Sequence, residues 1–248
     1  MRLAAFRTVL ILGLFGTPFA RAETDPAASE AFPFDSMTVS NRDLVRGVSD
    51  HYTLRCEYPA EKFKAHVAVF EYLIDHMESC SALAQKVGLI TYRATRRADG
   101  RLYADDHDGA TGYMLNIYAG AGKRIIYVEG AEHGSFDVRG RGLAIVNYRA
   151  TTGDAIEYTR TAFVKVDNVV LATLAQLFSV FLRSTVDSHF THVIRNPIAL
   201  SERAEREPQQ LLDQIRLMPE ADQQLLAPFA ALVRSNTPGA LADGVHPR

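Results

Sequence analysis

Residues 111–131 read TGYMLNIYAGAGKRIIYVEGA, two runs rich in tyrosine, isoleucine and valine on either side of Gly120-Ala121-Gly122. Such side chains favour the half-buried, pleated surface of a β-strand. A short glycine-containing segment between two strand-like runs is typical of a β-hairpin. The sequence therefore predicts antiparallel strands over Thr111–Ala119 and Lys123–Ala131.

The same pattern repeats on both sides of this hairpin. Four further strand-like runs surround two turn-like tripeptides: Leu89–Arg97 and Arg101–Ala104 flank Ala98-Asp99-Gly100, and Gly142–Ala150 and Asp154–Asp167 flank Thr151-Thr152-Gly153. Six consecutive strands joined by short turns predict an antiparallel sheet, because parallel neighbours need long crossover connections. Upstream, Tyr52–Tyr58 is a further short strand candidate, which Pro59 is expected to end.

Two segments show helical spacing of apolar residues. Ala60–Val87 predicts one broken helix or two short ones. Asn168–Arg195 carries the longest repeat, over about seven turns, and predicts a long amphipathic helix that Asn196-Pro197 ends. The polar chain beyond it holds two further helix candidates, Gln209–Met218 and Glu220–Arg234.

The first 22 residues have the three parts of a secretory signal peptide in the required order. Arg2 and Arg7 supply a basic start, Val9–Phe15 a short apolar core, and Ala20-Arg21-Ala22 a cleavage site. The core is far shorter than the ~20 residues that a membrane-spanning helix needs. Cleavage after Ala22 would remove three arginines and no acidic residue, which changes the formal net charge from −2 to −5. We therefore expect an exported, soluble bacterial protein, periplasmic or secreted, without a transmembrane segment in the mature chain.

The composition and the motifs exclude several classes of function. A composition of 47% hydrophobic and 23% charged residues is that of an ordinary globular protein. The negative net charge argues against a partner that is a nucleic acid. No G-x-S-x-G, P-loop or dinucleotide-binding motif is present, so no cofactor is expected. No metal is expected either, because the pair His189 and His192 lacks a third ligand.

The two cysteines allow two interpretations. Cys56 and Cys80 both lie after the predicted cleavage site. In an oxidising compartment an even pair predicts a disulfide. The alternative is two buried thiols, because cysteine packs well as a small hydrophobic residue.

The order of the predicted elements is a strand, a broken helix, six antiparallel strands and a long helix. The segment Asp50–Arg195 resembles the START-like (SRPBCC, helix-grip) superfamily in this order of elements. It also resembles the superfamily in Asp106–Gly112, which leads into a strand, and in Val166-Asp167-Asn168, which turns into the helix. The resemblance implies an α+β fold, in which a curved antiparallel sheet of six to seven strands wraps around the long C-terminal helix. It also implies a ligand cavity between sheet and helix, but no particular reaction.

Four segments follow from these observations. They are a signal peptide (residues 1–22), an N-terminal extension (23–49), a START-like ligand-binding domain (50–196) and a helical C-terminal tail (197–248). Tyrosines within strands would place hydroxyl groups in a mostly apolar ligand cavity. The alternation of side chains along strands allows Tyr92, Tyr113, Tyr127 and Tyr148 to lie on one concave face of the sheet. The candidate ligand-binding residues are Tyr92, Tyr113, Tyr127, Glu129, Tyr148, Phe178 and Phe181. No catalytic residue is assigned.

The leading hypothesis is an exported protein that holds a hydrophobic small molecule, such as a lipid or an isoprenoid, between sheet and helix, for example for transport. One alternative is a cyclase- or hydrolase-type enzyme that uses the same cavity, with Glu129 and a tyrosine as acid and base. Another is a subunit of an envelope complex, whose tail helices dock a partner protein.

Overall fold

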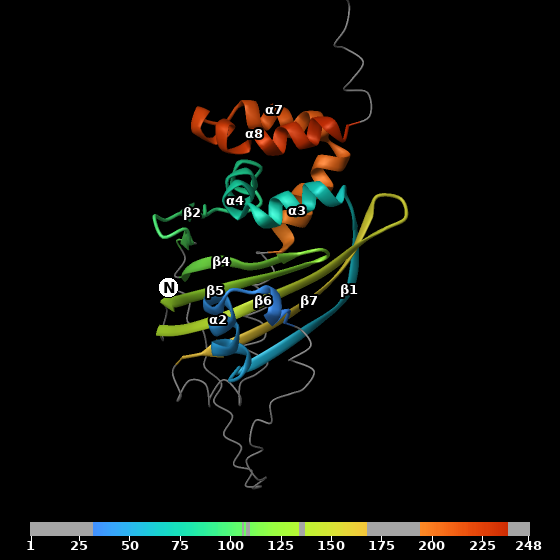
Figure 1. Ribbon diagram of the computed structural model, residues 1–248. Coiled ribbons are helices and arrows are strands. Elements are labelled where there is room, and N and C mark those ends of the chain that lie inside the picture. The colour runs from blue at the N-terminus through green and yellow to red at the C-terminus, as the bar shows by residue number, and fades with distance from the viewer. Residues whose placement is uncertain (1–31, 106, 108–109, 134–136, 168–193, 238–248) are drawn as a thin grey trace, which may run out of the picture. The chain divides into compact units, whose positions relative to one another are not determined.

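The computed structural model describes residues 32–105, 107, 110–133, 137–167 and 194–237 (Figure 1). The predicted signal peptide, residues 1–22, lies outside these residues. The long helix predicted over Asn168–Arg195 also lies outside them, except for its last two residues. Everything below concerns the described part of the chain, which begins with a short 3-10 helix, η1 (Phe34–Ser36).

Seven antiparallel strands form one open sheet in the order β1-β7-β6-β5-β4-β3-β2. The strands are β1 (Leu54–Lys64), β2 (Thr95–Arg96), β3 (Leu102–Asp105), β4 (Ala110–Gly120), β5 (Lys123–His133), β6 (Asp137–Thr151) and β7 (Ala155–Val166). Each strand from β2 to β6 pairs with the next along the chain, and β1 pairs with β7. The predicted α+β class and antiparallel sheet are therefore confirmed.

Tight turns connect the central strands where the sequence predicts them. Gly122 lies between β4 and β5 with φ +69°, a conformation that L side chains rarely adopt. A Cβ at this position would also lie 2.6 Å from the carbonyl oxygen of Tyr148. Gly153, between β6 and β7, has φ +78°. Both positions therefore require glycine for the hairpins to close.

Two expectations about strand ends are wrong. Pro59 does not end β1, which continues to Lys64 through an irregularity in its pairing with β7 between Tyr58 and Glu61. Proline is tolerated there because β1 lies at the edge of the sheet and is bulged. The strand predicted over Leu89–Arg97 is reduced to the two residues of β2.

The helical segment after β1 consists of two short helices, α3 (Val67–Asp75) and α4 (Met77–Lys86). They are separated at His76, whose backbone leaves the helical region with φ −116° and ψ 62°. Of the two alternatives that the sequence left open, the structure has two helices rather than one broken helix.

A further helix, α2 (Val39–Ser49), lies in the segment for which the sequence predicts only an N-terminal extension, residues 23–49. Its Val45 and Val48 are fully buried, and it contacts β6 and β7 (Figure 1). The Lys165 side chain of β7 donates a hydrogen bond to the Gly47 carbonyl oxygen at 2.8 Å. The sheet is therefore covered on this side by a helix that the sequence analysis missed.

The pairing register assigns strand side chains to two faces of the sheet. The α2 face carries Tyr113, Tyr127, Glu129, Leu143, Phe163 and Lys165. The α3 face carries Ile126, Ala144, Val146, Tyr148, Tyr158 and Arg160. The buried Phe70 and Ile74 of α3 pack against the α3 face, together with Phe63 and Ile194. The Phe70 ring meets Tyr148 edge to face, with ring centres 5.2 Å apart.

The prediction that Asn196-Pro197 ends a helix is wrong. Residues 194–206 are helical without interruption, and this helix (helix 194–206) stops before Pro208. Proline removes one backbone donor, but burial of Leu200 and Ala204 on the same helix favours continuation. The Ser201 hydroxyl donates to the Pro197 carbonyl oxygen at 2.6 Å.

The two predicted tail helices are present as α7 (Pro208–Arg216) and α8 (Glu220–Ser235). Their apolar residues form one buried cluster with those of α3, α4 and helix 194–206. The helix α8 lies against α3 and α4 (Figure 1). Asp222 of α8 is also bound by both terminal nitrogens of Arg93, at 2.5 and 3.0 Å. Within the described residues, no helix is long and apolar enough to cross a membrane.

Candidate functional site

Three of the predicted ligand-binding residues lie together on the α2 face. Tyr113 of β4 is directly opposite Glu129 of β5. The Tyr127 hydroxyl donates to one Glu129 carboxylate oxygen at 3.1 Å. Arg101 Nη1 donates to the other oxygen at 2.5 Å, and its guanidinium lies 4.4 Å from the centre of the Tyr113 ring. Both carboxylate oxygens of Glu129 therefore have partners within the protein.

This cluster does not favour acid–base catalysis at neutral pH. Burial, reinforced by the neighbouring Glu129 carboxylate, raises the pKa of Tyr127 to about 12. A catalytic acid or base works best with a pKa near the working pH. The Tyr127 hydroxyl instead stays protonated and serves as a hydrogen-bond donor to Glu129.

Tyr127 is expected to ionise near pH 12 rather than near pH 10, the ordinary value for tyrosine. Because the folded-state pKa is raised, Tyr127 stabilises the fold fully below pH 10, and this contribution is lost as the pH rises toward 12. An alkaline titration followed by phenolate absorbance, for the wild type and Tyr127→Phe, measures it. A difference between the two curves that develops near pH 10 would contradict the assignment.

The other predicted residues do not join this cluster. Tyr148 lies on the α3 face, opposite Tyr158, so the placement of all four tyrosines on one face is wrong. Tyr92 lies in the connection before β2, and not in a strand. Phe178 and Phe181 lie outside the described residues.

A polar network around the buried Arg124, which the sequence analysis missed, joins α3 to the sheet. Arg124 of β5 binds both carboxylate oxygens of Asp75, through Nε at 2.7 Å and Nη2 at 2.9 Å. The Asn116 amide donates to the same carboxylate at 3.0 Å, and the Tyr148 hydroxyl donates to Glu71 at 2.6 Å. The sequence signal for this network was Arg124 itself, a charged residue within a strand of mostly apolar residues. The bonds of the network tie two carboxylates of α3 to side chains of β4, β5 and β6, so we interpret the network as structural.

A small recess on the α3 face, which we call the sheet recess, lies between the sheet and Ile194, the first described residue of helix 194–206. It is lined by Tyr58, Ala144, Ile145, Val146, Arg160, Thr161, Ala162 and Ile194. Three strands thus form its floor and helix 194–206 contributes Ile194. Its volume is about 10 Å³, roughly the space for one water molecule.

Among the described residues that line the sheet recess, one, Arg160, is charged. Its Nη2 donates to a Glu61 oxygen at 2.5 Å, and the Tyr158 hydroxyl donates to the other Glu61 oxygen at 2.8 Å. Burial and the bond to Glu61 raise the pKa of Tyr158 to about 12, so this hydroxyl is also protonated at neutral pH. The described lining of the recess is therefore mostly apolar, with the Arg160 guanidinium as its charged group and Tyr58 and Thr161 as its hydroxyl-bearing residues.

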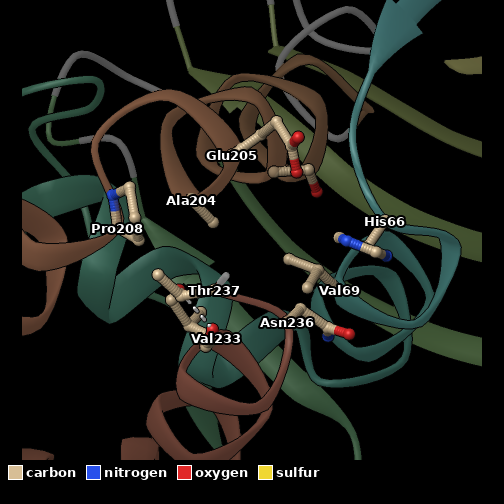
Figure 2. A pocket seen from close by; sticks show the side chains of 9 residues that line it. His66, Val69, Ala204, Glu205, Pro208, Val233, Asn236 and Thr237 are labelled. Atoms are coloured by element: carbon tan, nitrogen blue, oxygen red, sulfur yellow. Dashed lines mark hydrogen bonds between the residues drawn. The ribbon is translucent and has the colours of Figure 1, made fainter. Parts of the chain in front are cut away.

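A second recess, of about 40 Å³, lies between the start of α3, helix 194–206 and the end of α8 (Figure 2). It is lined by His66, Val69, Ser201, Ala204, Glu205, Pro208, Val233, Asn236 and Thr237. The Asn236 amide and the Thr237 hydroxyl donate to backbone carbonyls of their own helix. These polar groups therefore complete helix ends, and the recess is a weaker candidate for a ligand site.

Cys56 and Cys80 are both buried thiols in the structure, not a disulfide. Cys56 packs with Ala162 of the sheet, whereas Cys80 belongs to the cluster of α3, α4 and the tail. Of the two alternatives from the sequence, the structure has the thiols. Burial raises the pKa of the Cys80 thiol, which disfavours the reactive thiolate.

The described residues contain no group of three or more His, Cys, Asp or Glu side chains placed to hold a metal ion. The pair His189 and His192 lies outside the residues that the structure describes.

Comparison with known proteins gives distant structural likenesses. No protein-family model matches the chain, and no curated protein matches it. A conserved protein of Geobacillus kaustophilus is 14% identical, with 60% of this chain and 97% of that chain covered and a TM-score of 0.43. A hypothetical protein of Helicobacter pylori is 8% identical, over 60% and 89% of the two chains, with a TM-score of 0.38. A START superfamily protein of Mycobacterium smegmatis is 11% identical, over 59% and 97%, with a TM-score of 0.37. Likeness at this level carries no ligand or activity to this chain.

Proposed function

We propose that this chain is an exported START-like protein that binds a hydrophobic small molecule between the α3 face of its sheet and helix 194–206. The observation that carries the proposal is the sheet recess, whose floor is formed by β1, β6 and β7 and which Ile194 borders from the helix. A lipid or isoprenoid fits such a place because burial of its apolar surface contributes about 25 cal/mol per Å² without covalent chemistry.

Binding a molecule of that size requires the site to open. The sheet recess has a volume of about 10 Å³, whereas ligand pockets typically measure about 300–1,000 Å³. The buried Ile194 is the helix residue that borders the recess. We therefore propose that the ligand enters as helix 194–206 separates from β6 and β7 at Ile194, and that it replaces contacts between helix and sheet with contacts to itself.

Export is a part of the proposal that rests on the sequence. The basic start, short apolar core and Ala20-Arg21-Ala22 site support cleavage after Ala22. A periplasmic or secreted protein of this kind would carry a water-insoluble molecule through an aqueous compartment.

A single preparation tests the proposal. The full-length chain, expressed in a bacterial host, is expected in the periplasmic or secreted fraction with the intact mass of residues 23–248. Organic extraction and mass spectrometry of this material are expected to find one class of hydrophobic molecule in near-equimolar amount. A folded, purified protein without any extractable hydrophobic molecule would contradict the proposal.

A matched pair of variants localises the ligand. Ala162 is buried at the sheet recess, so Ala162→Leu should exclude the ligand and reduce the extracted amount severalfold. Ala150 is exposed on β6, and Ala150→Leu adds the same carbon atoms away from the recess. If Ala150→Leu retains the ligand and Ala162→Leu loses it, the ligand binds at the recess. Equal loss in both variants would contradict binding at the recess.

A further inference from the structure

Arg160 is the charged residue that lines the sheet recess, and its surroundings hold it in place. Its side chain is 14% exposed. The guanidinium lies 4.7 Å from the centre of the Tyr58 ring and 5.5 Å from that of Tyr158. These rings, one on β1 and one on β7, fix the guanidinium at the wall of the recess.

The hydrogen bonds of this group are incomplete. Arg160 Nη2 and the Tyr158 hydroxyl each occupy one oxygen of the Glu61 carboxylate. Arg160 Nε is buried and has no hydrogen-bond partner within the described part of the chain. A buried N–H without an acceptor is unfavourable, and such groups are rare in folded proteins. The unpaired Nε is therefore a place where an acceptor is expected.

The charge around the recess favours an acceptor that is anionic. Glu61 is the carboxylate that pairs with Arg160. Arg195, the residue after Ile194, is close enough that its charge, like that of Arg160, lowers the pKa of Tyr158. Two guanidinium groups and one carboxylate thus act electrostatically on the Tyr158 hydroxyl. A negative charge placed there would be stabilised, because a hydrogen bond between an ionised donor and an ionised acceptor is stronger than a neutral one.

We infer that the ligand is an amphipathic anion, whose apolar part lies in the sheet recess and whose head-group oxygen accepts a hydrogen bond from Arg160 Nε. This inference rests on the proposed function and adds the chemical class of the ligand. A fatty-acid carboxylate and an alkyl phosphate both offer the required oxygen. A neutral isoprenoid does not, and it would leave Nε unpaired.

Fluorescence titration with cis-parinaric acid and with its methyl ester tests the inference on the delipidated full-length protein. The wild type is expected to bind the acid about ten- to a hundredfold more tightly than the ester, the effect of one charge-assisted hydrogen bond. Arg160→Met should lower the affinity for the acid to that for the ester and leave the ester unchanged. Displacement of the probe by dodecanoate or by dodecyl phosphate then identifies the head group.

Arg149→Met is the matched control. Arg149 lies on β6, is 73% exposed and pairs with Glu157 away from the recess. Its replacement removes the same charge and should leave both affinities unchanged. If Arg160→Met does not fold, Arg160→Lys keeps the charge without the Nε donor and should weaken binding of the acid about tenfold.

The outcomes separate this inference from the function on which it rests. Equal affinity for acid and ester in the wild type, unchanged in the Arg160 variant, overturns the anionic head group but leaves a hydrophobic ligand. Failure of the wild type to bind either compound overturns both.

Discussion

The free energy of unfolding of the Arg124→Met variant is expected to be about 3–5 kcal/mol lower than that of the wild type. The Arg124 side chain is 7% exposed, and Asp75 receives two of its hydrogen bonds. Arg124 Nη1 also donates to the Gly120 carbonyl oxygen at 2.6 Å. Methionine would retain much of the packing volume but leave the Asp75 carboxylate with only the Asn116 amide among these partners. The decrease in unfolding free energy therefore measures the cost of leaving a carboxylate between α3 and the sheet without its cationic partner.

Urea unfolding followed by circular dichroism gives this free energy. Arg149→Met, at an exposed ion pair, is expected to change it by at most about 1 kcal/mol. The double variant Arg124→Met with Asp75→Leu should recover part of the loss, because it removes the carboxylate that the single variant leaves unpaired. A loss below about 1 kcal/mol for Arg124→Met would contradict the prediction and show that water at the partly exposed Asp75 carboxylate compensates for the missing guanidinium.

The central hairpins could be predicted from the sequence because their signals are local. Strand-forming residues on each side of a glycine turn define β4 and β5, and the φ of Gly122 is one that the turn requires. The tail helices α7 and α8 could also be predicted, since each is amphipathic over its own length. In both cases a few neighbouring residues contain the information.

The faces of the sheet could not be predicted in the same way. Tyr127 pairs with Leu143, and Tyr148 pairs with Tyr158, which places the two tyrosines on opposite faces. A change of one residue in the register of β5 and β6 would exchange the faces. Composition does not fix that register, so the sequence could not show that Tyr113, Tyr127 and Glu129 share one face while Tyr148 lies on the other.

The errors at Pro59 and Pro197 share one cause. Each residue was expected to end its element because proline lacks a backbone donor. β1 is an edge strand with a bulge, and helix 194–206 gains buried contacts beyond Pro197. Tertiary packing outweighs the local preference in both cases, and it is invisible in a single sequence.

The Phe229→Ala variant is expected to lose about 3–5 kcal/mol of unfolding free energy, the usual range when a large buried aromatic side chain is removed. Phe229 is fully buried in α8, and its ring centre lies 5.7 Å from that of Tyr72 in α3. Leu217→Ala, at a residue that is 71% exposed between α7 and α8, is the matched control and should change the free energy by less than about 0.5 kcal/mol.

The same measurement bears on the role of the tail. If α8 packs on α3 as described, Phe229→Ala should destabilise the whole protein in one cooperative urea transition. The reason is that the buried cluster around Phe229 includes Leu73 of α3 and Leu83 of α4. A tail that docks a partner helix instead would leave the sheet and α3 stable when Phe229 is removed. A separate early transition, or a loss of unfolding free energy below about 1 kcal/mol, would contradict this packing. Either result would favour a tail whose apolar face is available to another protein.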